Sequence, residues 1–130
     1  NYIRDLLVED DNRIWLATYS GVAVFDIDKK QFSFPEANKV LGFSPSFRLL
    51  QDDSKNIWVV AEEKLVAYNP ATGQAKSFRS EIGLPSGFDR LGVFRKSGDG
   101  NIWLAYNGGA CSFNPANYLQ PMAAMMAAYL

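Results

Sequence analysis

Acidic and amide side chains gather in three short turns, where they could bind a calcium ion or act as a catalytic pair of carboxylates. The turns hold Asp10-Asp11-Asn12, Asp52-Asp53 and Asp99-Gly100-Asn101. Calcium needs several oxygen ligands that converge in one loop, whereas each turn offers only two or three side chains. Asp, Asn and Gly also favour hairpin turns for backbone reasons. We therefore interpret these turns as structural, with neither a metal site nor a pair of catalytic carboxylates.

The composition narrows the chemistry further. The 130 residues contain one cysteine and no histidine, which excludes an internal disulfide, a Cys/His zinc site and imidazole as a catalytic base. Cys111 aligns with Ala23 and Val66 of the other repeats and is interpreted as a buried, slowly reacting thiol. Thirteen Lys and Arg nearly balance fourteen Asp and Glu without a basic cluster, so we expect no nucleic-acid partner. We also expect no cofactor, and no membrane contact, since no stretch approaches the roughly 20 apolar residues of a spanning helix.

The spacing of the three tryptophans indicates an internal sequence repeat, in which one of these turns precedes each tryptophan. Trp15, Trp58 and Trp103 are 43 and 45 residues apart, and each follows an isoleucine. An aromatic residue comes ten positions after each tryptophan. Such a period is typical of propeller blades.

Each repeat is predicted to be a meander of short antiparallel strands, because runs of β-forming residues alternate with two- to five-residue turns. The first repeat gives strands at 3–8, 14–18, 22–26 and 31–34; the second at 47–51, 57–61, 65–69 and 75–78; the third at 90–94, 102–106 and 110–113, with its fourth strand unclear.

Both faces of the Trp-containing strand are apolar, which predicts a sheet covered on both sides. Ile14 and Leu16 lie on one face, and Trp15 and Ala17 lie on the other. The predicted fold class is all-β, with three four-stranded blades of a larger β-propeller. Each tryptophan should be buried between blades, where it contributes roughly 2–3 kcal/mol by area.

The segments "EDDNRIWLATYSGVAVFD", "DDSKNIWVVAEEKLVAYNP" and "SGDGNIWLAYNGGACSFNP" resemble the two-component-regulator propeller repeat. The resemblance covers residues 1–117 and departs from the pattern at Ala61 and Tyr106, which replace a threonine, and at 62–64, which replace a glycine turn. It implies large extracytoplasmic sensor regions, often two propellers followed by an immunoglobulin-like domain, a membrane helix and a histidine kinase or diguanylate cyclase. Many such sensors respond to polysaccharide fragments.

The chain is accordingly divided into blades at 1–45, 46–86 and 87–117, and into a tail at 118–130. The tail is predicted to be the first strand of a following immunoglobulin-like domain, or a short helix, because its larger apolar residues also fall at helical spacing.

The resemblance implies a noncatalytic, ligand-sensing fragment of a periplasmic two-component sensor whose parent is a homodimer. Its partners would be an oligosaccharide or another small ligand, the rest of the propeller and the following domain. One alternative is a structural or dimerisation module. A second is a propeller enzyme, a lyase or glycosidase, with catalytic residues outside this chain.

A ligand is expected at the propeller rim, where the connections between and within blades are free to vary. Arginines near the starts of the inner strands could hold carboxylates or sugar hydroxyls by forked hydrogen bonds. The candidate binding residues are Arg4, Tyr19, Arg48, Glu62, Arg90 and Asn107.

Overall fold

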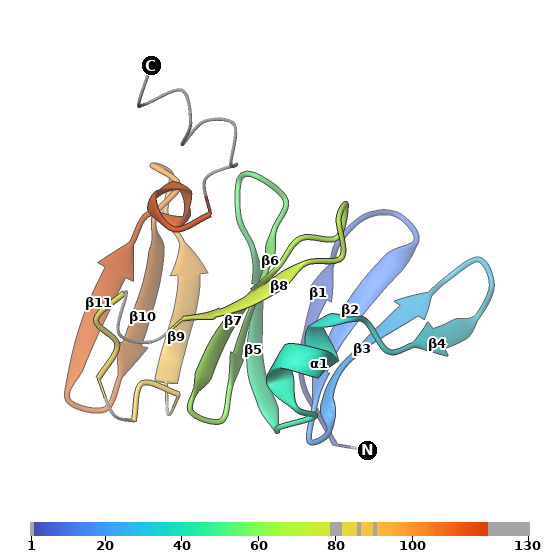
Figure 1. Ribbon diagram of the computed structural model, residues 1–130, viewed down its shortest axis with the longest axis horizontal. Coiled ribbons are helices and arrows are strands. Elements are labelled where there is room, and N and C mark those ends of the chain that lie inside the picture. The colour runs from blue at the N-terminus through green and yellow to red at the C-terminus, as the bar shows by residue number, and fades with distance from the viewer. Residues whose placement is uncertain (1, 79–81, 86, 90, 120–130) are drawn as a thin grey trace.

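Three antiparallel sheets stand side by side in the computed structural model (Figure 1), which describes residues 2–78, 82–85, 87–89 and 91–119. The first contains β1 (Ile3–Val8), β2 (Arg13–Thr18), β3 (Gly21–Asp26) and β4 (Gln31–Ser33). The second contains β5 (Ser46–Gln51), β6 (Ile57–Ala61), β7 (Lys64–Tyr68) and β8 (Ala75–Phe78). The third contains β9 (Leu91–Lys96), β10 (Ile102–Tyr106) and β11 (Gly109–Phe113).

Each sheet is a simple meander in which consecutive strands pair, so the predicted all-β blade architecture is confirmed, with four strands in the first two sheets and three in the third among the described residues. The first strand of each repeat, β1, β5 or β9, always forms the same edge of its sheet. After β11 the chain enters a short 3-10 turn, η1 (Pro115–Asn117). The prediction that the tail at 118–130 forms a strand or a short helix mostly lies outside the described residues, which include only Tyr118 and Leu119 of the tail.

A one-turn helix, α1 (Ala37–Leu41), interrupts the connection between the first two sheets, which was predicted to be a loop. Ala37 and Leu41 are four residues apart and both are fully buried. Residues at that spacing share one face of a helix, so burial of this pair favours helical over extended backbone. Gly42 ends the helix with a left-handed φ of 66°, a conformation that glycine adopts without strain.

Two apolar seams between the sheets form the core. The first joins the Trp15 face of sheet one to the Ile57 and Val59 face of sheet two. The second joins the Trp58 face of sheet two to the Ile102 and Leu104 face of sheet three. The two faces of β6 therefore pack into different seams, as its apolar alternation predicted, whereas β2 and β10 each place one face in a seam of the described residues.

Trp15 and Trp58 lie within these seams and both are 0% exposed. The ring of Trp15 lies 5.3 Å from that of Tyr68, and the ring of Trp58 lies 5.0 Å from that of Phe113. The interpretation of the tryptophan as an internal brace is confirmed at these two positions.

Trp103 was also predicted to be buried, but it is 46% exposed. Its neighbours in the strand, Ile102 and Leu104, point into the second seam. Trp103 points to the opposite face, and no other described sheet covers that face. The tryptophan motif therefore fixes the strand, whereas burial of the indole depends on a neighbouring sheet.

No helix among the described residues is long and apolar enough to cross a membrane.

Candidate functional site: the rim at one end of the sheets

The start of β1, the turns β2–β3, β6–β7 and β10–β11, and helix α1 lie at one end of the molecule, at the bottom of Figure 1. Two hydrogen bonds hold segments of this end together, one beside the β5–β6 ladder of the second sheet and one between the β6–β7 turn and the connection that leads to β9. The backbone N–H of Glu62 donates to the carbonyl of Pro45 at 2.9 Å. The backbone N–H of Glu63 donates to the carboxylate of Asp89 at 2.8 Å. We call this end the rim, and it consists of residues 2–4, 19–20, 35–47, 62–63, 82–85, 87–89 and 107–108.

A β-bulge interrupts the first strand of each sheet, β1, β5 or β9, at the rim. Ile3 and Asp5 pair with adjacent residues of β2, which leaves Arg4 without a pairing partner. Phe47 is unpaired between Ser46 and Arg48 in the same way. Gly92 is unpaired in β9, where Leu91 and Val93 pair with adjacent residues of β10. Arg4, Phe47 and Gly92 each precede their tryptophan by 11 residues, so the bulge belongs to the repeat.

Bulges bend a strand and redirect a side chain, and they are frequent next to functional sites. The bulge at Arg4 has a clear result, because aromatic rings surround the guanidinium. The guanidinium carbon lies 4.8 Å from the ring centre of Tyr19, 5.0 Å from that of Phe47 and 5.7 Å from that of Tyr2. We call Tyr2, Arg4, Tyr19 and Phe47 the Arg4 cluster.

The Arg4 cluster combines residues from two sheets and includes one side-chain hydrogen bond. Nη2 of Arg4 donates to the hydroxyl oxygen of Tyr19 at 2.8 Å. The rings of Tyr2 and Tyr19 meet edge to face at 5.8 Å. An aromatic face attracts a cation placed over it. The three rings therefore stabilise the charged guanidinium and hold it in one orientation. The sequence analysis named Arg4 and Tyr19 as separate candidates, and the structure brings them together and adds Tyr2 and Phe47, which the sequence analysis did not name.

The only carboxylate adjacent to Arg4 in sequence is directed to the backbone. Oδ2 of Asp5 accepts a hydrogen bond from the N–H of Leu49 at 2.9 Å, and Oδ1 accepts one from the N–H of Leu6 at 2.9 Å. Asp5 thus ties β1 to β5 just below the Arg4 cluster. Both of its oxygens are engaged away from the guanidinium.

Helix α1 is fixed to the first sheet by Asn38, which is only 2% exposed. Its Oδ1 accepts from the N–H of Val22 at 2.9 Å, and its Nδ2 donates to the carbonyl of Val22 at 2.8 Å. The amide therefore acts as a further strand residue beside β3. Gly21 is required here, because a Cβ at this position would lie 2.3 Å from Oδ1 of Asn38.

The second sheet holds the other end of α1. Nζ of Lys64 donates to the carbonyls of Leu41 and Val40 at 3.0 and 3.4 Å. A cation at the C-terminus of a helix satisfies carbonyls that have no partner within the helix. The connection between β4 and β5, which contains α1, is therefore hydrogen-bonded to both sheets. These bonds make the surroundings of the Arg4 cluster rigid.

The other predicted rim residues do not join the Arg4 cluster. Arg48 lies one position past its bulge, and its Nη1 donates to the carbonyl of Phe47 at 3.1 Å. Glu62 and Asn107 are exposed in the β6–β7 and β10–β11 turns. Arg90 lies outside the described residues. The arginines do not occupy equivalent positions, since only Arg4 is the unpaired residue of a bulge.

The acidic turns lie at the opposite end of the sheets, where their carboxylates organise the backbone. Oδ1 of Asp10 accepts from the N–H groups of Asn12 and Arg13 at 2.8 and 2.9 Å. The hydroxyl of Ser97 and the N–H of Asn101 lower the pKa of Asp99. In the part of the chain that the structure describes, no three His, Cys, Asp or Glu side chains gather in a way that could hold a metal ion.

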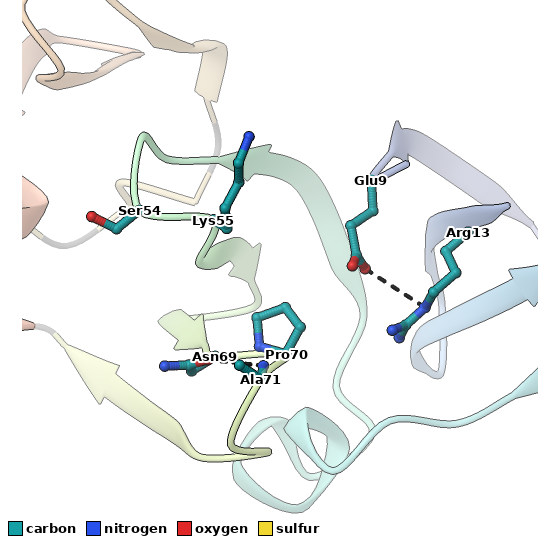
Figure 2. A pocket seen from close by; sticks show the side chains of 7 residues that line it. All are labelled: Glu9, Arg13, Ser54, Lys55, Asn69, Pro70 and Ala71. Atoms are coloured by element: carbon teal, nitrogen blue, oxygen red, sulfur yellow. Dashed lines mark hydrogen bonds and ion pairs between the residues drawn. The ribbon is translucent and has the colours of Figure 1, made fainter. Parts of the chain in front are cut away.

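A shallow opening of about 320 Å³ lies between the first two sheets at this opposite end (Figure 2). Three of its lining residues, Glu9, Arg13 and Asn69, already have partners. Oε1 of Glu9 accepts from Nε1 of Trp15 at 2.5 Å and lies 3.8 Å from Nε of Arg13. Oδ1 of Asn69 accepts from the N–H of Ala71 at 2.9 Å. We therefore interpret the opening as the mouth of the first seam.

Burial raises the pKa of the Cys111 thiol. The thiolate is the reactive form of cysteine, so this shift favours the unreactive, neutral thiol. The side chain packs against the second seam, which agrees with the interpretation of Cys111 as a small hydrophobic residue.

No protein-family profile matches the sequence, and no curated protein matches it. Solved structures do match. The fold is similar to the extracellular domain of BT4673 from B. thetaiotaomicron, described as a hybrid two component system, with a TM-score of 0.72 and 18% identity over 88% of this chain and 17% of that chain. A second structure of the BT4673 extracellular domain, described there as a one component system, has the same TM-score and identity over 93% of this chain and 18% of that one.

The fold is therefore that of propeller blades. The chain spans less than a fifth of the length of these two matches. Virginiamycin B lyase from Staphylococcus aureus is also similar, with a TM-score of 0.55 and 13% identity over 86% of this chain and 41% of that chain. At such identities the likeness shows a shared scaffold, which can carry different functions.

Proposed function

We propose that this chain is part of the extracytoplasmic, noncatalytic recognition propeller of a bacterial two-component sensor. The observation that supports this most strongly is the similarity of fold to the extracellular domain of BT4673 over 88% of the chain. The three matching sequence repeats point to the same class of protein independently. In this proposal the chain lies in the periplasm and works within a larger, dimeric protein.

Recognition is proposed to take place at the rim. The connection that contains α1 is fixed to the sheets by Asn38 and Lys64, while Tyr2 and Tyr19 of the Arg4 cluster are open to solvent. A rigid surface loses little conformational entropy on binding. Ligand contact would signal by favouring one of two packings between this propeller and the next domain, which requires different affinities for the two packings.

The proposal can be tested by calorimetric titration of the full chain with a panel of neutral and acidic oligosaccharides. We expect one class to bind at about micromolar strength, which corresponds to roughly 8 kcal/mol. The substitution Tyr19→Ala should abolish this binding, whereas Ile27→Ala, an exposed residue outside the rim, should preserve it. Binding that survives Tyr19→Ala would place recognition elsewhere. Turnover of an oligosaccharide would instead support an enzyme.

A further inference from the structure

The Arg4 cluster presents a positive charge that has no carboxylate partner among the described residues. The ion pairs in that part of the chain join Arg13 to Glu9, Lys39 to Glu36 and Lys96 to Asp53. Asp5, the acidic residue next to Arg4, directs both oxygens to backbone N–H groups. The guanidinium is therefore charged and exposed, and no carboxylate of residues 2–78, 82–85, 87–89 or 91–119 forms an ion pair with it.

The orientation of the guanidinium is nevertheless fixed. Three rings contact it, and Nη2 is bonded to the Tyr19 hydroxyl. A guanidinium held in this way loses little rotamer freedom when its remaining N–H groups bind an acceptor. Its planar fork matches the two oxygens of a carboxylate better than any neutral acceptor does.

The rings around Arg4 also offer an apolar surface for the body of a ligand. Tyr2 and Tyr19 are 65% and 49% exposed, although large aromatic residues are usually much more buried. The C–H groups of a sugar ring can pack against such faces. The cluster therefore combines one anion-binding group with two open aromatic faces at the end of the molecule where recognition is proposed.

We propose that the Arg4 cluster binds a small ligand that carries a carboxylate on a ring. The carboxylate is held by the guanidinium fork of Arg4, and the ring of the ligand lies against Tyr2 and Tyr19. This inference rests on the proposed recognition function and adds the chemical class of the ligand. A hexuronate is the simplest molecule with both features.

Three probes separate the parts of this proposal. Glucuronate carries the ring and the carboxylate, glucose carries the ring alone, and acetate carries the carboxylate alone. The measurement is titration of the full chain by NMR, following the Nε–H signal of Arg4. We expect glucuronate to shift this signal and to bind at least about tenfold more tightly than glucose, because only the carboxylate forms a charge-assisted, bidentate pair.

Variants test whether Arg4 acts through its fork or through its charge. Arg4→Lys retains the charge and should weaken glucuronate binding about tenfold, because an ammonium lacks the planar fork. Arg95→Lys is the matched control, since Arg95 is exposed and lies outside the rim; it should leave binding unchanged. The circular dichroism spectrum and melting temperature of each variant should match those of the parent chain.

The remaining outcomes are decisive. Equal binding of glucose and glucuronate would overturn the carboxylate assignment but leave recognition at the rim intact. Equal binding of acetate and glucuronate would overturn the role of the rings and retain that of Arg4. If none of the probes shifts the Arg4 signal, while a neutral oligosaccharide still binds in the Tyr19-dependent manner proposed above, the carboxylate inference is wrong and the recognition function stands.

Discussion

Trp58 and Trp103 occupy the same position of the repeat but have opposite environments. Trp58 is enclosed in the second seam, and its Nε1 donates to Oδ2 of Asp52 at 2.9 Å. Trp103 faces outward, and the residue equivalent to Asp52 is Ser97, whose hydroxyl bonds to Asp99 and to the carbonyl of Asn101. A carboxylate six residues upstream therefore accompanies a buried indole in this chain, since Glu9 serves Trp15 in the same way.

The difference shows which properties come from the repeat and which come from its neighbours. Strand and turn are present in all three repeats, because they depend on local residue types. Burial of the indole requires a second sheet, and a buried N–H then requires an acceptor. Substitutions at these positions should therefore change the free energy of unfolding by different amounts, which urea denaturation of the chain measures.

The largest effect is expected from Trp58→Ala. This substitution removes a fully buried ring that contacts Phe78 and Phe113, and it should lower the free energy of unfolding by about 3–5 kcal/mol. A loss below about 1 kcal/mol would mean that the second seam does not depend on its tryptophan.

Asp52→Ala should be the next most destabilising change. Asp52 is buried, and its carboxylate accepts from Trp58 and from the N–H groups of Ser54 and Asn56, both at 2.9 Å. Loss of this acceptor leaves buried donors unpaired, so we expect a decrease of about 2–3 kcal/mol in the free energy of unfolding.

Asp53→Ala is the control for Asp52→Ala. Asp53 is exposed, and its ion pair with Lys96 lies at the surface, where such pairs contribute about 0–1 kcal/mol. If both substitutions cost the same, the buried hydrogen bond to the indole has no special role.

Glu9→Gln should have a smaller effect in the first seam. Glutamine retains an oxygen that can accept from Nε1 of Trp15 but has no negative charge, so the loss should be about 1 kcal/mol. The indole N–H signal of Trp15 in NMR spectra should shift while remaining protected from exchange. An unprotected signal would show that the charge, and not the acceptor, keeps the seam closed.

Trp103→Ala should have the smallest effect, about 1 kcal/mol or less, because roughly half of its surface is already in water. Acrylamide quenching gives an independent measurement. Most of the quenchable fluorescence should disappear in Trp103→Phe, while Trp58→Phe should leave it in place. A cost of Trp103→Ala as large as that of Trp58→Ala would reveal a partner that covers this face.

The strands could be predicted from the sequence because each is bounded by turn chemistry and contains alternating apolar residues. The same pattern of strands and turns recurs in each repeat, which supported each predicted strand. The predicted strands at 57–61, 75–78 and 102–106 have the same bounds as β6, β8 and β10. Helix α1 was missed because five residues are too few for a periodic pattern. Its formation depends instead on tertiary contacts made by Asn38 and Lys64.

The candidate site was only partly predictable. Arg4 and Tyr19 could be chosen because polar residues at the rim have no packing role. Tyr2 and Phe47 were missed, since Phe47 comes from the next sheet and only three-dimensional structure brings it to Arg4. The bulge could not be predicted from residue type, because its unpaired position holds Arg in the first repeat, Phe in the second and Gly in the third.

The bulge has a consequence for how such a scaffold diversifies. Residues 4, 47 and 92 have no ladder partner, and each precedes the tryptophan of its repeat by 11 residues. Side chains in these three slots can therefore be exchanged with little penalty to folding. A combinatorial library confined to them would sample new specificities on an unaltered framework.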